Sequence, residues 1–219
     1  MLGYLLLIIS VVEFFIGLYL IFRYEKSQAT TYYGLFAISV AIYVAANGFG
    51  FTRASDNEFI FEQLAWFGGL LSAPFILGFS YSFPSPKKYP TELFPWVIWP
   101  VVLFGAGIFT SNIFLEKTYI YSFAEGYTAP IGVFFWFAIA VFAMYWIWAI
   151  RNLLYTRLHT SGFYRNFLTI VLIGLFSSLL ISAIFDIYIP LVSVTRYGYI
   201  GALFSSIWLF TTAYLMVRK

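Results

Sequence analysis

The sequence contains no cysteine, a single histidine and few charged residues. Without cysteine the chain forms no disulfide and no thiolate site, and one histidine leaves no plausible transition-metal site. Charged residues make up 10% of the chain, whereas they account for about a quarter of an ordinary soluble domain. Together with an apolar share of 62%, this composition excludes a typical soluble protein.

Signatures of catalysis are missing as well. The sequence has no glycine-rich phosphate-binding loop and no serine or aspartate with a paired general base. We therefore expect no catalytic residue and no enzyme activity. The last apolar stretch contains no lysine, which excludes the Schiff base that a retinal protein requires. We expect no cofactor and no bound metal.

Seven apolar stretches are long enough to cross a bilayer, since a spanning helix needs about 20 residues. They cover approximately residues 2–22, 31–51, 59–83, 93–111, 130–151, 166–187 and 198–217. Such runs are too long and too continuous for the strands of a membrane barrel. The prediction is an all-α, polytopic protein of the cell membrane, with residues 1–219 forming a single seven-transmembrane helix bundle.

The basic residues are distributed unevenly between these stretches. Nine of the twelve lie in alternate gaps or at the C-terminal end, namely Arg23, Lys26, Lys87, Lys88, Arg151, Arg157, Arg165, Arg218 and Lys219. The other gaps hold Arg53, Lys117 and Arg196. Because short cytoplasmic loops retain lysine and arginine, we expect the N-terminus outside and the C-terminus in the cytoplasm. The net charge of +3 suits anionic lipids of the inner leaflet rather than nucleic acid.

Two further expectations concern the ends and gaps of the spans. The first stretch has no basic segment before it, so it should be a retained span rather than a cleaved signal peptide. The long outer gap at 112–129 is rich in aromatic residues, which in one part of it occupy every second position. It forms either a small β-hairpin over the outer face or an interfacial loop with aromatic anchors.

One carboxylate lies near the middle of the first span. Glu13 shares a helix face with Ser10 and Gly17. An ionised carboxylate there would cost roughly 2.5–3.5 kcal/mol, so Glu13 should face the bundle interior, be protonated, or have a partner. Its role is either that of a ligand contact or proton-responsive group, or that of a buried hydrogen bond that fixes helix packing.

A second set of polar residues follows the second span, where Ser39, Tyr43 and Asn47 are spaced by four and form one stripe. Polar side chains of this kind either bind a ligand or bond to a neighbouring helix. We include Tyr43 and Asn47 among the candidate ligand-binding residues.

Charged residues also gather at the outer ends of the spans. Glu62 opens the third span with Trp66 one turn further in, Asp186 ends the sixth, and Arg196 precedes the seventh. They either line the opening of a pocket or form a solvated rim, where ion pairs contribute only ~0–1 kcal/mol. The candidate ligand-binding residues are therefore Glu13, Tyr43, Asn47, Glu62, Trp66, Asp186 and Arg196.

The last two spans carry small residues at helical spacing. The sixth has Gly174, Ser178, Ser182 and Asp186, and the seventh has Gly198, Ala202 and Ser206. Small residues allow helices to approach closely, so these two spans should pack against each other. Three tryptophans within the spans, Trp136, Trp146 and Trp208, either line a cavity or face lipid and core.

Six short segments form a pattern in the third span and near the end of the chain. They are 66–68 (WFG), 73–75 (APF), 79–84 (FSYSFP), 186–191 (DIYIPL), 197–201 (YGYIG) and 213–218 (AYLMVR). Together they resemble the seven-helix N-terminal region of bacterial sensor histidine kinases. The resemblance implies a sensing module whose last helix leads to a cytoplasmic signalling domain or partner. It also implies a homodimer. The chain is then either the sensing part of a longer protein or a free-standing relative.

Three functions remain open at this point. The first is a sensory input module in the lipid bilayer that binds a small ligand or senses membrane state. The second is a transporter or channel for a small solute, with Glu13 and Asn47 as contacts. The third is a scaffold without a ligand, which predicts a solid interior around Glu13 and Asn47.

Overall fold

The computed structural model describes residues 1–24, 27–52, 58–84, 94–110, 135–189 and 199–218, and all regular structure in them is helical. The elements are α1 (Leu2–Phe22), α2 (Gln28–Thr52), α3 (Glu58–Ser82), α4 (Phe94–Thr110), α5 (Phe135–Leu158), α6 (Gly162–Ser182), η3 (Ala183–Tyr188) and α8 (Tyr199–Val217). The π-helical η3 continues α6 without a break. The predicted all-α bundle of seven helices is confirmed.

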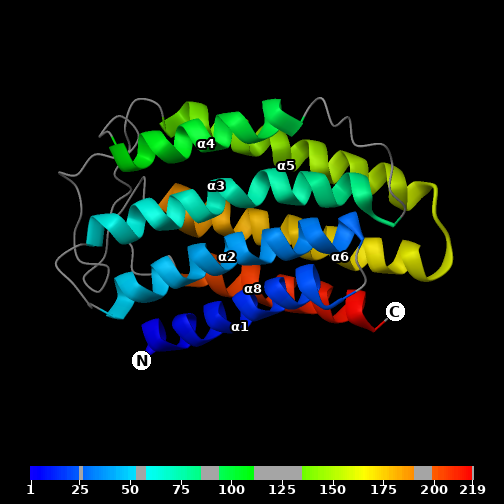
Figure 1. Ribbon diagram of the computed structural model, residues 1–219, viewed down its shortest axis with the longest axis horizontal. Coiled ribbons are helices and arrows are strands. Elements are labelled where there is room, and N and C mark those ends of the chain that lie inside the picture. The colour runs from blue at the N-terminus through cyan, green and yellow to red at the C-terminus, as the bar shows by residue number, and fades with distance from the viewer. Residues whose placement is uncertain (25–26, 53–57, 85–93, 111–134, 190–198, 219) are drawn as a thin grey trace.

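Helices are the expected elements because a lipid-embedded backbone must satisfy its hydrogen bonds within the segment. Six of the described helices have the length and hydropathy to cross a membrane, and α4 is a shorter apolar helix. The helices run alternately up and down, so the two termini lie at opposite ends of the bundle (Figure 1). Which end faces the cytoplasm stays a prediction of the charge pattern.

The helices α5 and α6 extend into the basic gap between their apolar stretches. The structure continues α5 to Leu158 and begins α6 at Gly162, whereas the predicted stretches ended at 151 and began at 166. Arg157 of α5 donates from Nε to the hydroxyl of Thr169 on α6, at 2.7 Å. Hydropathy marks the part of a helix that lies in lipid, and these polar ends extend beyond it. The outer gap at 112–129, for which a β-hairpin and an interfacial loop are the two predictions, lies outside the described residues.

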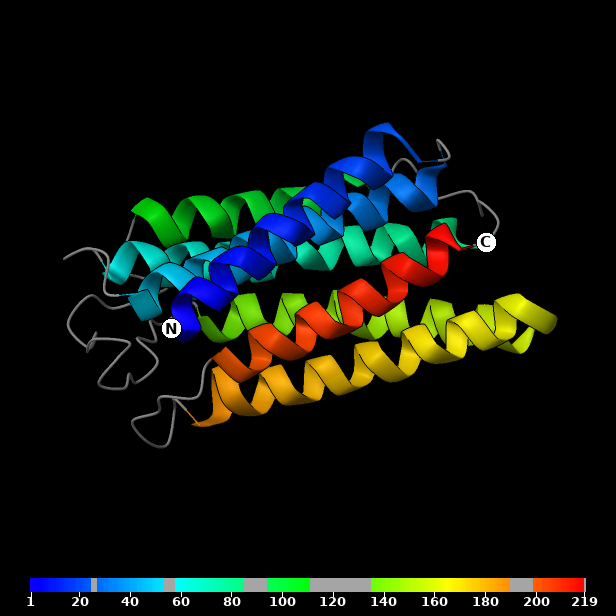
Figure 2. The ribbon, with the colours of Figure 1, turned by 90° about the horizontal axis from the view of Figure 1, so that it is seen from below.

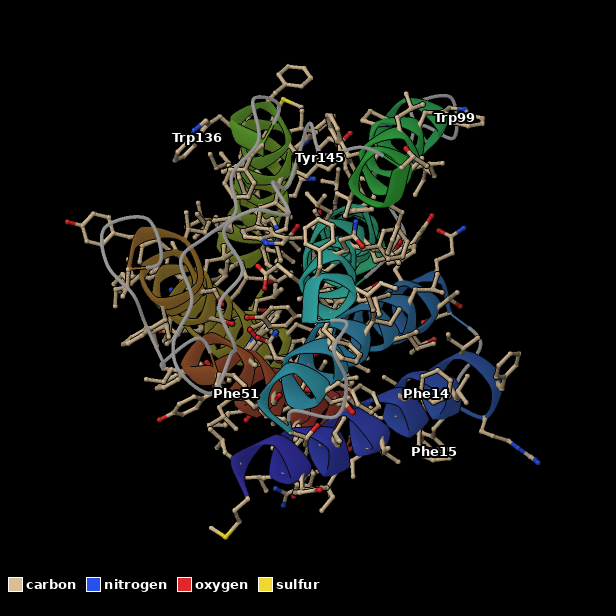
Figure 3. All side chains as sticks on the ribbon, turned by 90° about the vertical axis from the view of Figure 1, so that its left-hand side faces the viewer. Phe14, Phe15, Phe51, Trp99, Trp136 and Tyr145 are labelled. Carbon is tan, nitrogen blue, oxygen red and sulfur yellow. The ribbon has the colours of Figure 1, made fainter. Side chains whose placement is uncertain are left out.

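The helices form two rows. The helices α1, α2, α3 and α4 follow one another in the first row, and α8, α6 and α5 form the second (Figure 3). Figure 2 shows α8 between α1 and α6. Phe14 and Phe15 of α1 point away from the bundle, as do Trp99 and Trp136 (Figure 3), which places apolar rings toward lipid.

Glycine contacts hold α1 against α2. A Cβ atom on Gly17 would lie 2.7 Å from the carbonyl oxygen of Gly34, and one on Gly3 would lie 2.7 Å from that of Gly48. The two helices are antiparallel, and Gly3 and Gly17 are as far apart along α1 as Gly34 and Gly48 are along α2. Only glycine permits this backbone approach, which is a recurring device of membrane helix packing.

The helix α2 approaches α3 in a similar manner. A Cβ atom on Gly68 would lie 2.7 Å from the backbone nitrogen of Tyr43. Side chains that donate to carbonyl groups of other helices add to this packing. Gln63 donates to the Ile108 carbonyl of α4 at 2.6 Å, and Tyr145 of α5 donates to the Val97 carbonyl at 3.1 Å. These bonds place α4 over α3 and α5.

Glu13 lies at the contact of α1 with α2 and α8, with 0% of its surface exposed. Within the described part of the chain neither carboxylate oxygen has a hydrogen-bond partner. Ser206 of α8 is beside Glu13, but its hydroxyl donates to the Ala202 carbonyl at 2.9 Å. Nearby, Tyr33 of α2 donates to the Leu209 carbonyl at 3.0 Å. The expected interior position is confirmed. A hydrogen bond, one of the two roles predicted for Glu13, is not found among the described residues.

We predict that replacing Gly17 by leucine will separate α1 from α2 and lower the thermal unfolding temperature in detergent. Overpacking of this kind costs about 1–3 kcal/mol or more. Gly69→Leu is the matched control, because a Cβ atom on Gly69 would have no heavy atom within 4 Å. Circular dichroism of both variants tests the prediction, and equal losses of stability would contradict it.

We also predict that Glu13→Met will raise the unfolding temperature. The variant removes a buried polar group without a partner, whose burial costs about 1–3 kcal/mol, and keeps a side chain of similar length. Glu13→Gln keeps a buried polar group, so its stability should stay close to that of the unchanged chain. If the methionine variant unfolded at a lower temperature than the glutamine variant, Glu13 would have a stabilising partner.

Candidate functional site

A cavity of about 370 Å³ lies between the two rows of helices. Its walls come from α2, α3, α5, α6, η3 and α8. The volume falls in the range of roughly 300–1,000 Å³ that is typical of small-molecule sites. Most of the lining is apolar, and most of its polar side chains, Asn47 and Glu62 among them, lie in the half of the bundle that contains the N-terminus. An apolar wall with a few polar groups is typical of small-molecule sites.

One end of the cavity contains a carboxylate, and we call it the acidic end. Glu62 lies one turn inside α3 and is 7% exposed. Its Oε1 atom accepts a hydrogen bond from Nε1 of Trp66 at 2.7 Å. The Trp66 ring meets Phe135 of α5 edge to face, with centroids 4.8 Å apart. A buried acid oriented by an indole therefore borders the cavity.

Asn47 of α2 also lines the acidic half of the cavity, one turn after Tyr43. Its side-chain amide donates to the Tyr43 carbonyl of the same helix at 2.9 Å. An asparagine side chain has two N–H donors and one carbonyl oxygen. The bond to Tyr43 uses only one of the two N–H groups. Asn47 therefore has hydrogen-bonding groups that a ligand could use.

The opposite end, which we call the aromatic end, is lined by Phe36, Trp146 and Trp208. Phe36 meets Trp208 at a centroid distance of 5.3 Å and Trp146 at 6.2 Å, both edge to face. Trp208 donates from Nε1 to the Val171 carbonyl of α6 at 3.1 Å. Nε1 of Trp146 is buried and has no partner among the described residues. At the aromatic end the N–H of Trp208 is therefore already bonded, whereas the N–H of Trp146 is a donor without a described partner.

The helices α6 and α8 form one side of the cavity. The hydroxyl groups of Ser178 and Ser205 lie 3.0 Å apart, and both residues line the cavity. Trp208 also packs against Gly174 of α6. The predicted close contact of the last two spans is confirmed. It uses Ser205 rather than Ser206, however, because Ser206 faces Glu13 on the other side of α8.

The structure brings four of the seven candidate residues to one cavity: Tyr43, Asn47, Glu62 and Trp66. Glu13 does not line it and lies at the contact of α1 with α8. The side chain of Asp186 and the whole of Arg196 lie outside the described residues. Their assignment as ligand contacts therefore stays a prediction.

Sequence reasoning missed other residues of the cavity. Gly69 lines it and leaves open space beside its Cα atom, while its neighbour Gly68 packs against α2. Phe36 shares the helix face of Tyr43 and Asn47 but is apolar, and Ser178 and Ser182 belong to a stripe that predicts helix packing. Of the three tryptophans within spans, Trp146 and Trp208 line the cavity, and Trp136 points outward (Figure 3).

The scaffold hypothesis predicts a solid interior around Glu13 and Asn47. The interior is filled around Glu13 but hollow beside Asn47. In the described part of the chain, no group of three His, Cys, Asp or Glu residues could hold a metal ion.

Comparison with known proteins supplies the family. The family model for the N-terminal 7TM region of histidine kinase matches residues 5–217, which is almost the whole chain. No curated protein and no solved structure gives a significant match. With its apolar helices the chain is a multi-pass protein of the lipid bilayer. It belongs to the family of N-terminal seven-transmembrane regions of histidine kinases, which are membrane-embedded sensory input domains rather than catalytic ones.

Proposed function

We propose that the chain binds a small ligand in the cavity and relays its presence through α6 and α8 to a cytoplasmic output. The observation that carries this proposal is the composition of the cavity wall. Ser178, Ser205 and Trp208 belong both to the cavity lining and to the contact between α6 and α8. A ligand therefore touches the last two helices where they touch each other.

Trp208 is the residue that we propose to transmit the change. One side of its ring lines the cavity, another packs against Gly174, and its N–H is bonded to the Val171 carbonyl. A ligand that presses on this ring alters the fit of α8 on α6. A switch needs two arrangements that bind the ligand with different affinity, and two orientations of Trp208 would provide them.

The proposed signal leaves the bundle at the end where α8 ends. The described basic residues all lie toward this end: Arg23, Arg151, Arg157, Arg165 and Arg218. Short cytoplasmic segments retain basic residues, so we assign this end to the cytoplasm. The polar lining residues Asn47 and Glu62 lie toward the other end of the bundle, and the aromatic end of the cavity lies toward the basic end.

We further propose that the chain functions as a homodimer, in which α8 meets α8 of a second copy. The residues on the outer face of α8 are spaced alternately by three and four, and they are Phe204, Ile207, Thr211, Tyr214 and Arg218. This spacing is the one that lets two helices form a coiled coil. A dimer contact on the last helix would place the two output ends side by side.

The relay predicts that filling the cavity changes the distance between the C-terminal end of α8 and the beginning of α6. Because the sequence contains no cysteine, spin labels can be attached at Phe163→Cys and Val217→Cys, two exposed positions. We expect Gly69→Leu to shift the distance between the labels by about 1–2 Å, as helix shifts at interfaces do. Pulsed electron paramagnetic resonance in liposomes measures it.

Gly69→Ala is the matched control, because a methyl group leaves most of the cavity empty and should not shift the distance. Identical distance distributions for the leucine variant and the unchanged chain would contradict the relay.

The dimer predicts that a single cysteine at Tyr214 will cross-link two copies in native membranes under mild oxidation. Phe15→Cys is the control, since Phe15 is equally exposed but lies on α1. We expect a covalent dimer from the first variant and a monomer from the second on non-reducing gels. Equal cross-linking of both variants, or none from the first, would contradict the α8 contact.

A further inference from the structure

The shape of the cavity restricts what it can hold. Its lining runs along α2 from Phe36 to Asn47 and along α3 from Glu62 to Ser72. Eleven residues of helix span ~16 Å, so the cavity, with a volume of about 370 Å³, is elongated along the bundle axis. Its length and its mostly apolar wall suit an alkyl chain.

The cavity also reaches the side of the bundle. Ile147 of α5 lines it while being 66% exposed, and Ala183 of η3 lines it and is exposed too. Both residues lie in segments that cross the membrane, so what they are exposed to is the hydrocarbon region of the bilayer. A ligand can enter between α5 and η3 directly from the membrane.

The acidic end of the cavity restricts which head group a ligand can have. Trp66 is the hydrogen-bond partner of Glu62 within the described residues, and no described basic side chain lines the cavity. A buried carboxylate without a counter-charge is costly. A protonated amine would supply the charge and up to three N–H donors, of which Asn47 could accept one. The nearby Trp66 and Phe135 rings add faces that attract cations, and an anionic head group would be repelled.

We propose that the ligand is a single-chain amphiphile with a protonated amine head group, taken up from the bilayer. This inference rests on the proposed function and specifies the ligand of the same site. The amine binds at Glu62 and Asn47, and the alkyl chain lies between α3 and α5. The last carbons of the alkyl chain contact the aromatic end of the cavity, where Trp208 packs against α6.

The test uses dodecylamine brominated at its last carbon, because bromine quenches tryptophan fluorescence on contact. The corresponding alcohol and carboxylic acid are the matched probes. The protein is reconstituted in lipid nanodiscs, and Trp136→Phe removes one lipid-facing fluorophore that does not line the cavity. We expect saturable quenching by the amine that unbrominated dodecylamine reverses, with weaker binding of the alcohol and weakest binding of the acid.

Two variants assign the effect to the cavity. Glu62→Gln should lower the affinity for the amine about tenfold or more, which is the loss of a charged hydrogen bond, and bring it close to that of the alcohol. Gly69→Leu should abolish reversible quenching by all three probes. The unfolding temperature of each variant verifies that it is folded.

The outcomes separate the two proposals. Equal binding of the three probes, or no effect of Glu62→Gln, would overturn the amine head group while leaving the cavity as a ligand site. Absence of reversible quenching by every probe would overturn the single-chain amphiphile. If Gly69→Leu also left the distance between α6 and α8 unchanged, the proposed function itself would be overturned.

Discussion

The close approach of α2 to its neighbours is the constraint on which the rest of the structure depends. Gly17 and Gly34 bring α1 to α2, and Gly68 brings α3 to α2, each at backbone contact. By contrast, α5 contains no glycine, and its inner face carries large side chains such as Phe142 and Trp146. One row of helices is thereby drawn together while α5 stays further away. The cavity is the space that this difference leaves.

The last helix connects two different polar regions. Ser205 faces α6 and the cavity, whereas Ser206 faces Glu13 on α1. A movement of α8 therefore changes the surroundings of the cavity and of a buried carboxyl group at the same time. This double contact gives the helix that leads out of the bundle a direct connection to the interior, without a long chain of intermediate residues.

The candidate site was predictable where a pattern lies within one helix. Glu62 with Trp66, and Tyr43 with Asn47, are spaced by four and necessarily share a face. The interior position of Glu13 could also be predicted from its own helix. Glu13 nevertheless lies outside the cavity, because its neighbours come from α2 and α8. The stripe of Ala202 and Ser206 predicts a contact with α6, but Ser205 lies at that contact instead. The reason is that Trp208 packs against Gly174 and thereby sets the orientation of α8 about its axis.

The amino-acid sequence alone determined the number of helices, their approximate lengths, the family, and the ends at which charges gather, because these depend on hydropathy along the chain. Tertiary structure decided which residues of a helix meet a partner and which meet a cavity. Gly68 and Gly69 illustrate this: identical neighbours, about 100° apart around the helix, of which one is in contact with α2 and the other faces open space. The difference arises from helices that are distant in the sequence.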